Sequence, residues 1–121
     1  MTTASEKQLK TIDYCLTDFR DQKTYEITSF LPALLDNLLI PTSIGMEMSA
    51  VYIDCDVDQD GLPDNLKNTK GITFEFMDEF VTLPTEEGIN YITDWIEKNI
   101  LENREEILQK VEKLKVKYLK K

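Results

Sequence analysis

The sequence contains no histidine, and it has only two cysteines, four glycines and four prolines. Histidine is the commonest general base near neutral pH and the commonest zinc ligand, so both roles would fall to other residue types. Cys15 and Cys55 form no C-x-x-C motif, and two cysteines make no disulfide framework. We therefore expect two ordinary free thiols, and the thiolate of Cys55 is disfavoured by the aspartates on either side of it.

Long apolar runs are also missing. The most apolar stretch, residues 30–40, is interrupted by Pro32, Asp36 and Asn37 and is too short to span a bilayer. The first ten residues, MTTASEKQLK, do not resemble a signal peptide. These features predict a cytoplasmic protein with no membrane partner.

Positive charge is scarce. The chain has 23 acidic residues against 14 basic ones, which gives a formal net charge of −9. Proteins that bind nucleic acid carry a basic face, so we expect no nucleic-acid partner. A surface of this charge is complementary to a basic protein. The length of 121 residues suits one modest core, which predicts a single domain over residues 1–121.

The spacing of apolar residues predicts two helices near the start of the chain. Residues 5–20 carry an apolar side chain every three or four positions, and Ser5 is the expected N-cap. A second helix is expected over residues 24–39, where Pro32 either kinks the helix or delays its start.

The middle of the chain has the alternation of strands. Residues 46–55, 71–76 and 80–83 are the expected strands, although both faces of the first are mixed and its core face stays open. Two further helices are expected, one opening with Thr85 as its N-cap and one over residues 102–118. The prediction is an α+β fold with two N-terminal helices, a small three-stranded antiparallel sheet and two C-terminal helices.

Charge is unevenly distributed along the chain. Residues 47–79 contain nine acidic residues and two lysines, whereas residues 107–121 contain six lysines and one glutamate. Leucine and valine are interleaved with these lysines, which favours a solvated amphipathic helix over an RNA- or lipid-binding tail. The acidic middle of the chain needs a separate explanation.

Residues 56–64 (DVDQDGLPD) match the first nine positions of a calcium-binding loop, which has carboxylates at alternate positions and a glycine at its turn. An EF-hand is not expected, for two reasons. The twelfth residue of the loop, counted from Asp56, is Lys67 where an EF-hand has a bidentate glutamate, and a predicted strand instead of a helix precedes the loop. The segment is more similar to the DxDxDG loops of thrombospondin-type and dockerin-type repeats. The calcium ligands would be the carboxylates of Asp56, Asp58, Asp60 and Asp64 and the carbonyl of Leu62.

Two other interpretations of this segment stay open. Its aspartates and glycine also suit a solvated turn without a ligand. Alternatively, its carboxylates imitate the phosphate spacing of nucleic acid and fill the basic cleft of a protein partner. The sequence contains no Gly-rich phosphate loop, no G-x-S-x-G elbow and no H-E-x-x-H motif, so we expect no enzyme and nominate no catalytic residue. A general scaffold that uses the C-terminal helix is a further alternative.

Residues 71–83 (GITFEFMDEFVTL), followed by TEEGINYI at 85–92, resemble a known family. The chain is similar here to the small immunity proteins that neutralise ribonuclease toxins of bacterial contact-dependent growth inhibition and related polymorphic toxin systems. In that family a strand with a G-apolar-x-F pattern leads through an acidic turn to a second strand and to a helix rich in tyrosine and isoleucine. The resemblance covers about residues 71–100.

The resemblance implies a non-enzymatic inhibitor that needs no cofactor, binds a basic nuclease toxin domain tightly and covers its active site. Acidic residues of the chain would pair with the lysines and arginines that hold RNA phosphates in the toxin. The expected partner-binding residues are Asp54, Asp56, Asp58, Asp60 and Asp64, with Glu75, Asp78 and Glu79 as a second acidic group.

Overall fold

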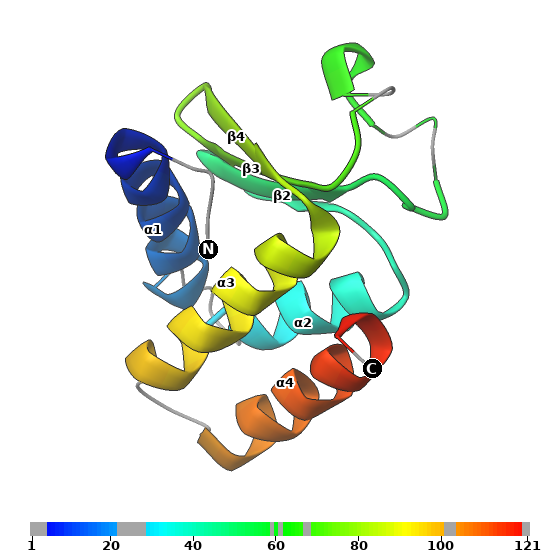
Figure 1. Ribbon diagram of the computed structural model, residues 1–121. Coiled ribbons are helices and arrows are strands. Elements are labelled where there is room, and N and C mark those ends of the chain that lie inside the picture. The colour runs from blue at the N-terminus through cyan, green and yellow to red at the C-terminus, as the bar shows by residue number, and fades with distance from the viewer. Residues whose placement is uncertain are drawn as a thin grey trace.

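The fold places four helices on one side of an antiparallel sheet, and the last helix packs on the second and third (Figure 1). The computed structural model describes residues 5–21, 29–58, 60, 62–66, 69–100 and 104–119. Within these residues the predicted α+β class is confirmed, but the sheet has four strands and not three.

The helices are α1 (Glu6–Asp21), α2 (Leu31–Leu39), α3 (Thr85–Asn99) and α4 (Arg104–Tyr118). Helix α2 begins at Leu31, later than predicted, because Pro32 occupies its first turn, where a missing N–H and a fixed φ are tolerated. The predicted residues 24–28 and 102–103 lie outside the described part of the chain.

The two N-cap predictions have different outcomes. The Ser5 Oγ accepts a hydrogen bond from the Gln8 N–H (3.2 Å), and the Gln8 Oε1 accepts one from the Ser5 N–H (2.8 Å), which makes a capping box. The prediction for Thr85 is wrong, since Pro84 holds the N-cap position with ψ at 149° and accepts a hydrogen bond from the Gly88 N–H (2.8 Å). Thr85 is therefore already the first helical residue.

The strands are β1 (Ile44–Gly45), β2 (Ser49–Ile53), β3 (Ile72–Phe76) and β4 (Glu79–Leu83), and they pair antiparallel in sequence order. β1 was not predicted, because two residues are too few to show alternation. β4 begins one residue earlier than predicted, since Met77 and Asp78 form a two-residue turn with φ values of 48° and 70°.

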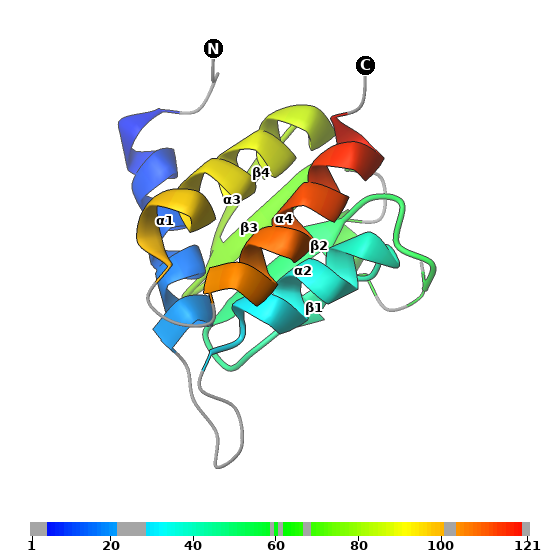
Figure 2. The ribbon, with the colours of Figure 1, turned by 90° about the horizontal axis from the view of Figure 1, so that it is seen from below.

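The register assigns the two faces of the sheet. Val51, Phe74 and Val81 lie opposite one another and are buried on the inner face, beneath which the helices lie side by side in Figure 2. The core face of β2, which the alternation left open, is therefore that of Val51 and Ile53. Tyr52 lies on the opposite, outer face, which the helices do not cover (Figure 1).

Candidate functional site

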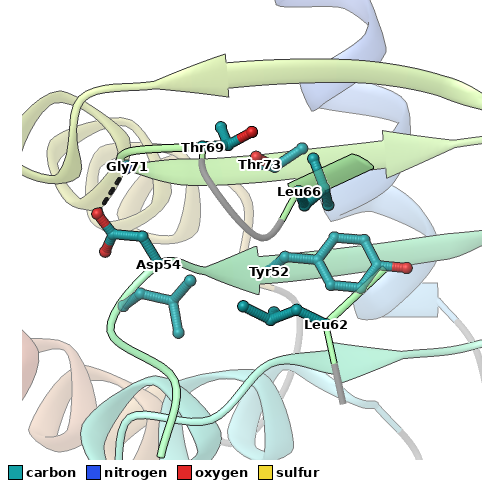
Figure 3. A pocket seen from close by; sticks show the side chains of 8 residues that line it. Tyr52, Asp54, Leu62, Leu66, Thr69, Gly71 and Thr73 are labelled. Atoms are coloured by element: carbon teal, nitrogen blue, oxygen red, sulfur yellow. Dashed lines mark hydrogen bonds between the residues drawn. The ribbon is translucent and has the colours of Figure 1, made fainter. Parts of the chain in front are cut away.

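Residues 54–64, which we call the acidic segment, begin where β2 ends. The Asp54 carboxylate accepts a hydrogen bond from the Gly71 N–H (2.8 Å; dashed in Figure 3), and the Asp54 N–H donates to the Gly71 carbonyl (3.1 Å). Gly71 has a φ of 109°, a conformation that a residue with a Cβ rarely adopts. Asp54 thus ties the start of the segment to the start of β3.

Asp56 serves the fold from inside the same segment. It is only 6% exposed, and its Oδ2 accepts the Ser43 N–H while its Oδ1 accepts the Asp58 N–H, each at 2.7 Å. Burial alone would raise the pKa of Asp56, but hydrogen bonds from the Ser43 hydroxyl and from these two N–H groups outweigh burial and lower the pKa from its ordinary value. Asp56 therefore remains ionised at neutral pH and joins the backbone at Ser43 to the backbone at Asp58.

Two leucines hold the far end of the acidic segment and the turn that follows it. Leu62 and Leu66 are 5% and 7% exposed, and they cover Tyr52 and Thr73 on the outer face of the sheet (Figure 3). The space left between these side chains is about 10 Å³, which is room for no more than one water molecule. The segment is therefore packed onto the sheet at Leu62, and no small molecule fits between these side chains.

Three other aspartates of the segment, Asp58, Asp60 and Asp64, are exposed. The side chains of Asp58 and Asp60 form no hydrogen bond or ion pair with any described residue. Val57, between the anchor Asp56 and Asp58, is 67% exposed, and its N–H donates to the Pro41 carbonyl (3.0 Å). The described residues of the segment thus present carboxylates and one apolar side chain, and the backbone at Val57 and Asp58 is held by hydrogen bonds.

The second predicted acidic group is not part of this surface. Glu75 lies on the outer face and accepts a hydrogen bond from the Tyr52 hydroxyl (3.0 Å). Asp78 and Glu79 lie at the other end of the strands, in and after the β3–β4 turn. Five residues of strand separate that turn from Asp54, which is roughly 15 Å. Asp78 and Glu79 therefore belong to a different end of the molecule.

The calcium hypothesis concerns the same segment. In the part of the chain that the structure describes, no three Cys, Asp or Glu side chains are placed to hold one metal ion. Both oxygens of Asp56 accept backbone hydrogen bonds. Gln59 and Gly61, which complete the loop, lie outside the described residues. Calcium binding stays a prediction.

The cysteines are the free thiols that the sequence predicted. Burial raises the pKa of Cys15 to about 12. Burial and the nearby Asp54 carboxylate raise the pKa of Cys55, as expected for a thiol between aspartates. Neither thiol is therefore activated as a nucleophile.

Sequence analysis missed the two leucines that attach the acidic segment to the sheet. Leu62 and Leu66 are four residues apart in a polar stretch, and this spacing was the available signal. The sequence analysis predicted that Asp56 binds calcium or a protein partner, because the sequence does not show that Ser43 lies beside it.

Comparison with known proteins adds no relative. No protein-family model, no curated protein and no solved structure matches the chain. Among the described residues, no helix has both the length and the hydropathy needed to cross a membrane.

Proposed function

We propose that this protein is an immunity protein that binds a basic ribonuclease toxin domain through the acidic segment and blocks its active site. The observation that carries the proposal is the state of Asp58 and Asp60. Both are exposed and have no side-chain partner among the described residues, although Asp56, which precedes them, and Leu62, which follows them, are both buried. Such carboxylates are available to lysines and arginines of another protein.

Anchoring of the segment favours tight binding. Binding costs free energy when a mobile loop has to be ordered, and a loop already packed on the sheet has less of this cost. Exposed acidic groups also accelerate the encounter with a cationic partner. The 67% exposed side chain of Val57 adds an apolar contact in the middle of the charged surface.

A ribonuclease domain is the partner whose chemistry fits this surface. It holds RNA phosphates with lysines and arginines, so its active site is a basic cleft. In such a cleft, exposed aspartates take the place of the RNA phosphates. These aspartates are Asp58, Asp60 and Asp64. In this proposal Asp54 and Asp56 position the segment. The protein catalyses no reaction and needs no cofactor. It acts in the cytoplasm, where the toxin meets RNA.

The proposal is tested by co-expression with the product of the gene directly upstream in the native genome. We expect a one-to-one complex that survives purification in low salt, weakens in high salt and has no ribonuclease activity. A purified upstream protein that is a ribonuclease but neither binds nor is inhibited by this chain would contradict the immunity function. An inhibited complex that is indifferent to salt would retain the function and reject the acidic segment as its basis.

A further inference from the structure

The two edges of the sheet differ in how they are protected. The strand order is β1–β2–β3–β4, so β1 and β4 are the edge strands (Figure 2). β1 has only two residues, and a short edge strand offers little backbone to another chain. β4 has five residues, EFVTL, with no lysine, no proline and no bulge in its register with β3. Proteins protect edge strands by such features, so β4 is the unprotected edge.

The hydrogen bonds of the sheet show which residues of β3 bond to β4. Gly71 and Met77, on either side of β3, bond to the residues next to the two ends of β2, with N···O distances of 3.1 and 2.9 Å. Successive residues of a strand direct their backbone groups alternately to one neighbouring strand and to the other. The central residue of β3, Phe74, therefore bonds to β4, where its partner is Val81.

The two neighbours of Val81 face the open edge. Since Val81 bonds to β3, the N–H and C=O groups of Phe80 and Thr82 point away from β3. These groups form no hydrogen bond with any residue that the structure describes. Both side chains are exposed, that of Phe80 by 42%. β4 thus presents a donor and an acceptor from each of these residues, in the alternation that an added strand uses.

The residues of β4 match a second copy of the same strand. In a two-fold pairing centred on Val81, Phe80 of one copy lies opposite Thr82 of the other, so the outward groups of both residues are all paired. A pairing centred on Thr82 places Phe80 opposite Pro84, which has no N–H. A pairing centred on Phe80 places Thr82 opposite Asp78, whose φ of 70° is not that of a strand. The pairing centred on Val81 is therefore the one that satisfies both edges.

The side chains of this pairing are compatible as well. Phe80 and Thr82 meet on the outer face of the sheet, and an aromatic residue opposite a β-branched one is a favourable cross-strand pair. Glu79 is the only charged residue of β4, and it lies opposite Leu83 of the other copy, so no like charges face each other. The net charge of −9 on each copy opposes association over longer distances, and salt screens this repulsion.

We propose that β4 pairs with β4 of a second copy in an antiparallel, two-fold arrangement that joins the two sheets into one. The dimer is held by backbone hydrogen bonds of Phe80 and Thr82 across an axis at Val81. The proposal does not depend on the immunity function, because the acidic segment follows β2, which is separated from this edge by β3.

The first test is sedimentation velocity of the wild-type chain at low and at high salt. The interface is small, so over about 10–500 µM we expect a reversible dimer with a dissociation constant in the micromolar range. High salt should strengthen this dimer, since it screens the repulsion between two acidic copies. A chain that stays monomeric throughout, or a dimer that salt weakens, overturns the proposal.

Amide hydrogen exchange locates the interface without any substitution. The Phe80 and Thr82 amides should exchange at least about twofold more slowly in the dimer than in the monomer, because they become hydrogen-bonded there. The Val81 amide, which faces β3, is the internal reference and should be protected in both. Dimerisation without slower exchange at Phe80 and Thr82 overturns the interface. Slower exchange that appears only in a complex with the upstream gene product would assign this edge to that protein and overturn the dimer.

The variants Thr82→Pro and Thr82→Val form a matched pair. Both remove the hydroxyl that lies 2.7 Å from the Thr73 hydroxyl, but only proline removes the outward N–H. Since that N–H is not bonded to β3, Thr82→Pro should remain folded, as edge strands with proline do. It should dimerise at least about tenfold more weakly than Thr82→Val, which should dimerise like the wild type. Equal dimerisation of the two variants overturns the pairing, and the exchange measurement decides if Thr82→Pro does not fold.

Discussion

At the scale of single residues, Asp56 shows why an aspartate-rich motif has more than one meaning. Its two oxygens each accept a backbone hydrogen bond, and these bonds lower its pKa from the ordinary value of an aspartate although burial opposes them. The neighbouring Asp58 has no side-chain partner among the described residues. Two aspartates of the same motif therefore have different roles, one in holding the backbone and one at the surface.

Asp56→Asn should lower the free energy of unfolding by about 1–3 kcal/mol at pH 7, since a buried acceptor of two N–H groups loses its charge. A carboxylate whose pKa is lower in the folded chain than in the unfolded chain stabilises the fold at pH values above the unfolded-state pKa. This stabilisation is lost as the pH falls through the folded-state pKa. The difference between the wild type and Asp56→Asn should therefore shrink below about pH 4. Urea unfolding at several pH values measures it, and a difference that does not change with pH would contradict this role.

Gly71 offers a second test at this scale. A Cβ on Gly71 would overlap the Leu83 carbonyl oxygen, and the residue has a φ of 109°. We expect Gly71→Ala to lower the free energy of unfolding by more than about 3 kcal/mol. Gly45→Ala is the control, because its Cβ would lie 3.6 Å from the Ala50 Cβ, an ordinary contact. Equal stability of the two variants would contradict the geometry described for the start of β3.

At the scale of elements, the periodicity of apolar residues predicted where most helices and strands lie. The helices around Leu16, Ile92 and Val111 were predicted because one side of each is apolar. The strands around Val51 and Phe74 were predicted from alternation, although the core face of the first was not. Boundaries were less predictable, since Pro84 and the Met77–Asp78 turn act through backbone geometry. The packing of the acidic segment on the sheet was not predicted, because it depends on contacts between residues distant in sequence.

The acidic segment should behave as part of the fold. Leu62→Ala removes a side chain of the segment that is 5% exposed, so we expect a loss of about 2 kcal/mol in the free energy of unfolding. Val57→Ala removes a side chain that is 67% exposed and should change it by less than about 0.5 kcal/mol. Thermal or urea unfolding of both variants measures this. Equal effects would mean that the segment is not packed onto the sheet.

The same element gives the prediction for calcium. If the exposed aspartates serve a protein partner, as proposed, and not an ion, millimolar calcium should leave the melting temperature where it is in chelator. An ion that binds only the folded chain would raise the melting temperature. A rise of several degrees that is absent from Asp58→Asn/Asp60→Asn would favour the calcium loop over the partner surface.

At the scale of the whole molecule, the two charged regions differ in how far they are neutralised. Lys110 and Lys115 of α4 form ion pairs with Asp36 of α2 and Glu97 of α3, each at 2.7 Å. The α4 helix buries Ile107, Val111 and Leu114, as the amphipathic prediction requires. Part of the positive charge of the C-terminal helix is thus neutralised by acidic residues of α2 and α3. Asp58 and Asp60 have no such cation among the described residues, so their charge is not neutralised there.

The central claim, that the acidic segment binds the cationic cleft of a ribonuclease, is tested most directly by titration calorimetry with the upstream gene product. The variants are Asp58→Lys/Asp60→Lys and a control with the same charge change, Glu105→Lys/Glu106→Lys. The control residues are exposed at the amino end of α4, away from the acidic segment (Figure 1). Melting curves first establish that both variants are folded. This control is needed because a lysine in place of a glutamate in the first turn of a helix lowers the stability of that helix.

We expect Asp58→Lys/Asp60→Lys to weaken binding at least about a hundredfold and to flatten its salt dependence, because two charge-assisted contacts become repulsive. Glu105→Lys/Glu106→Lys should stay within about threefold of the wild type, since only long-range charge is changed. Equal affinities of the two variants would show that the net charge of the protein, and not the acidic segment, determines binding.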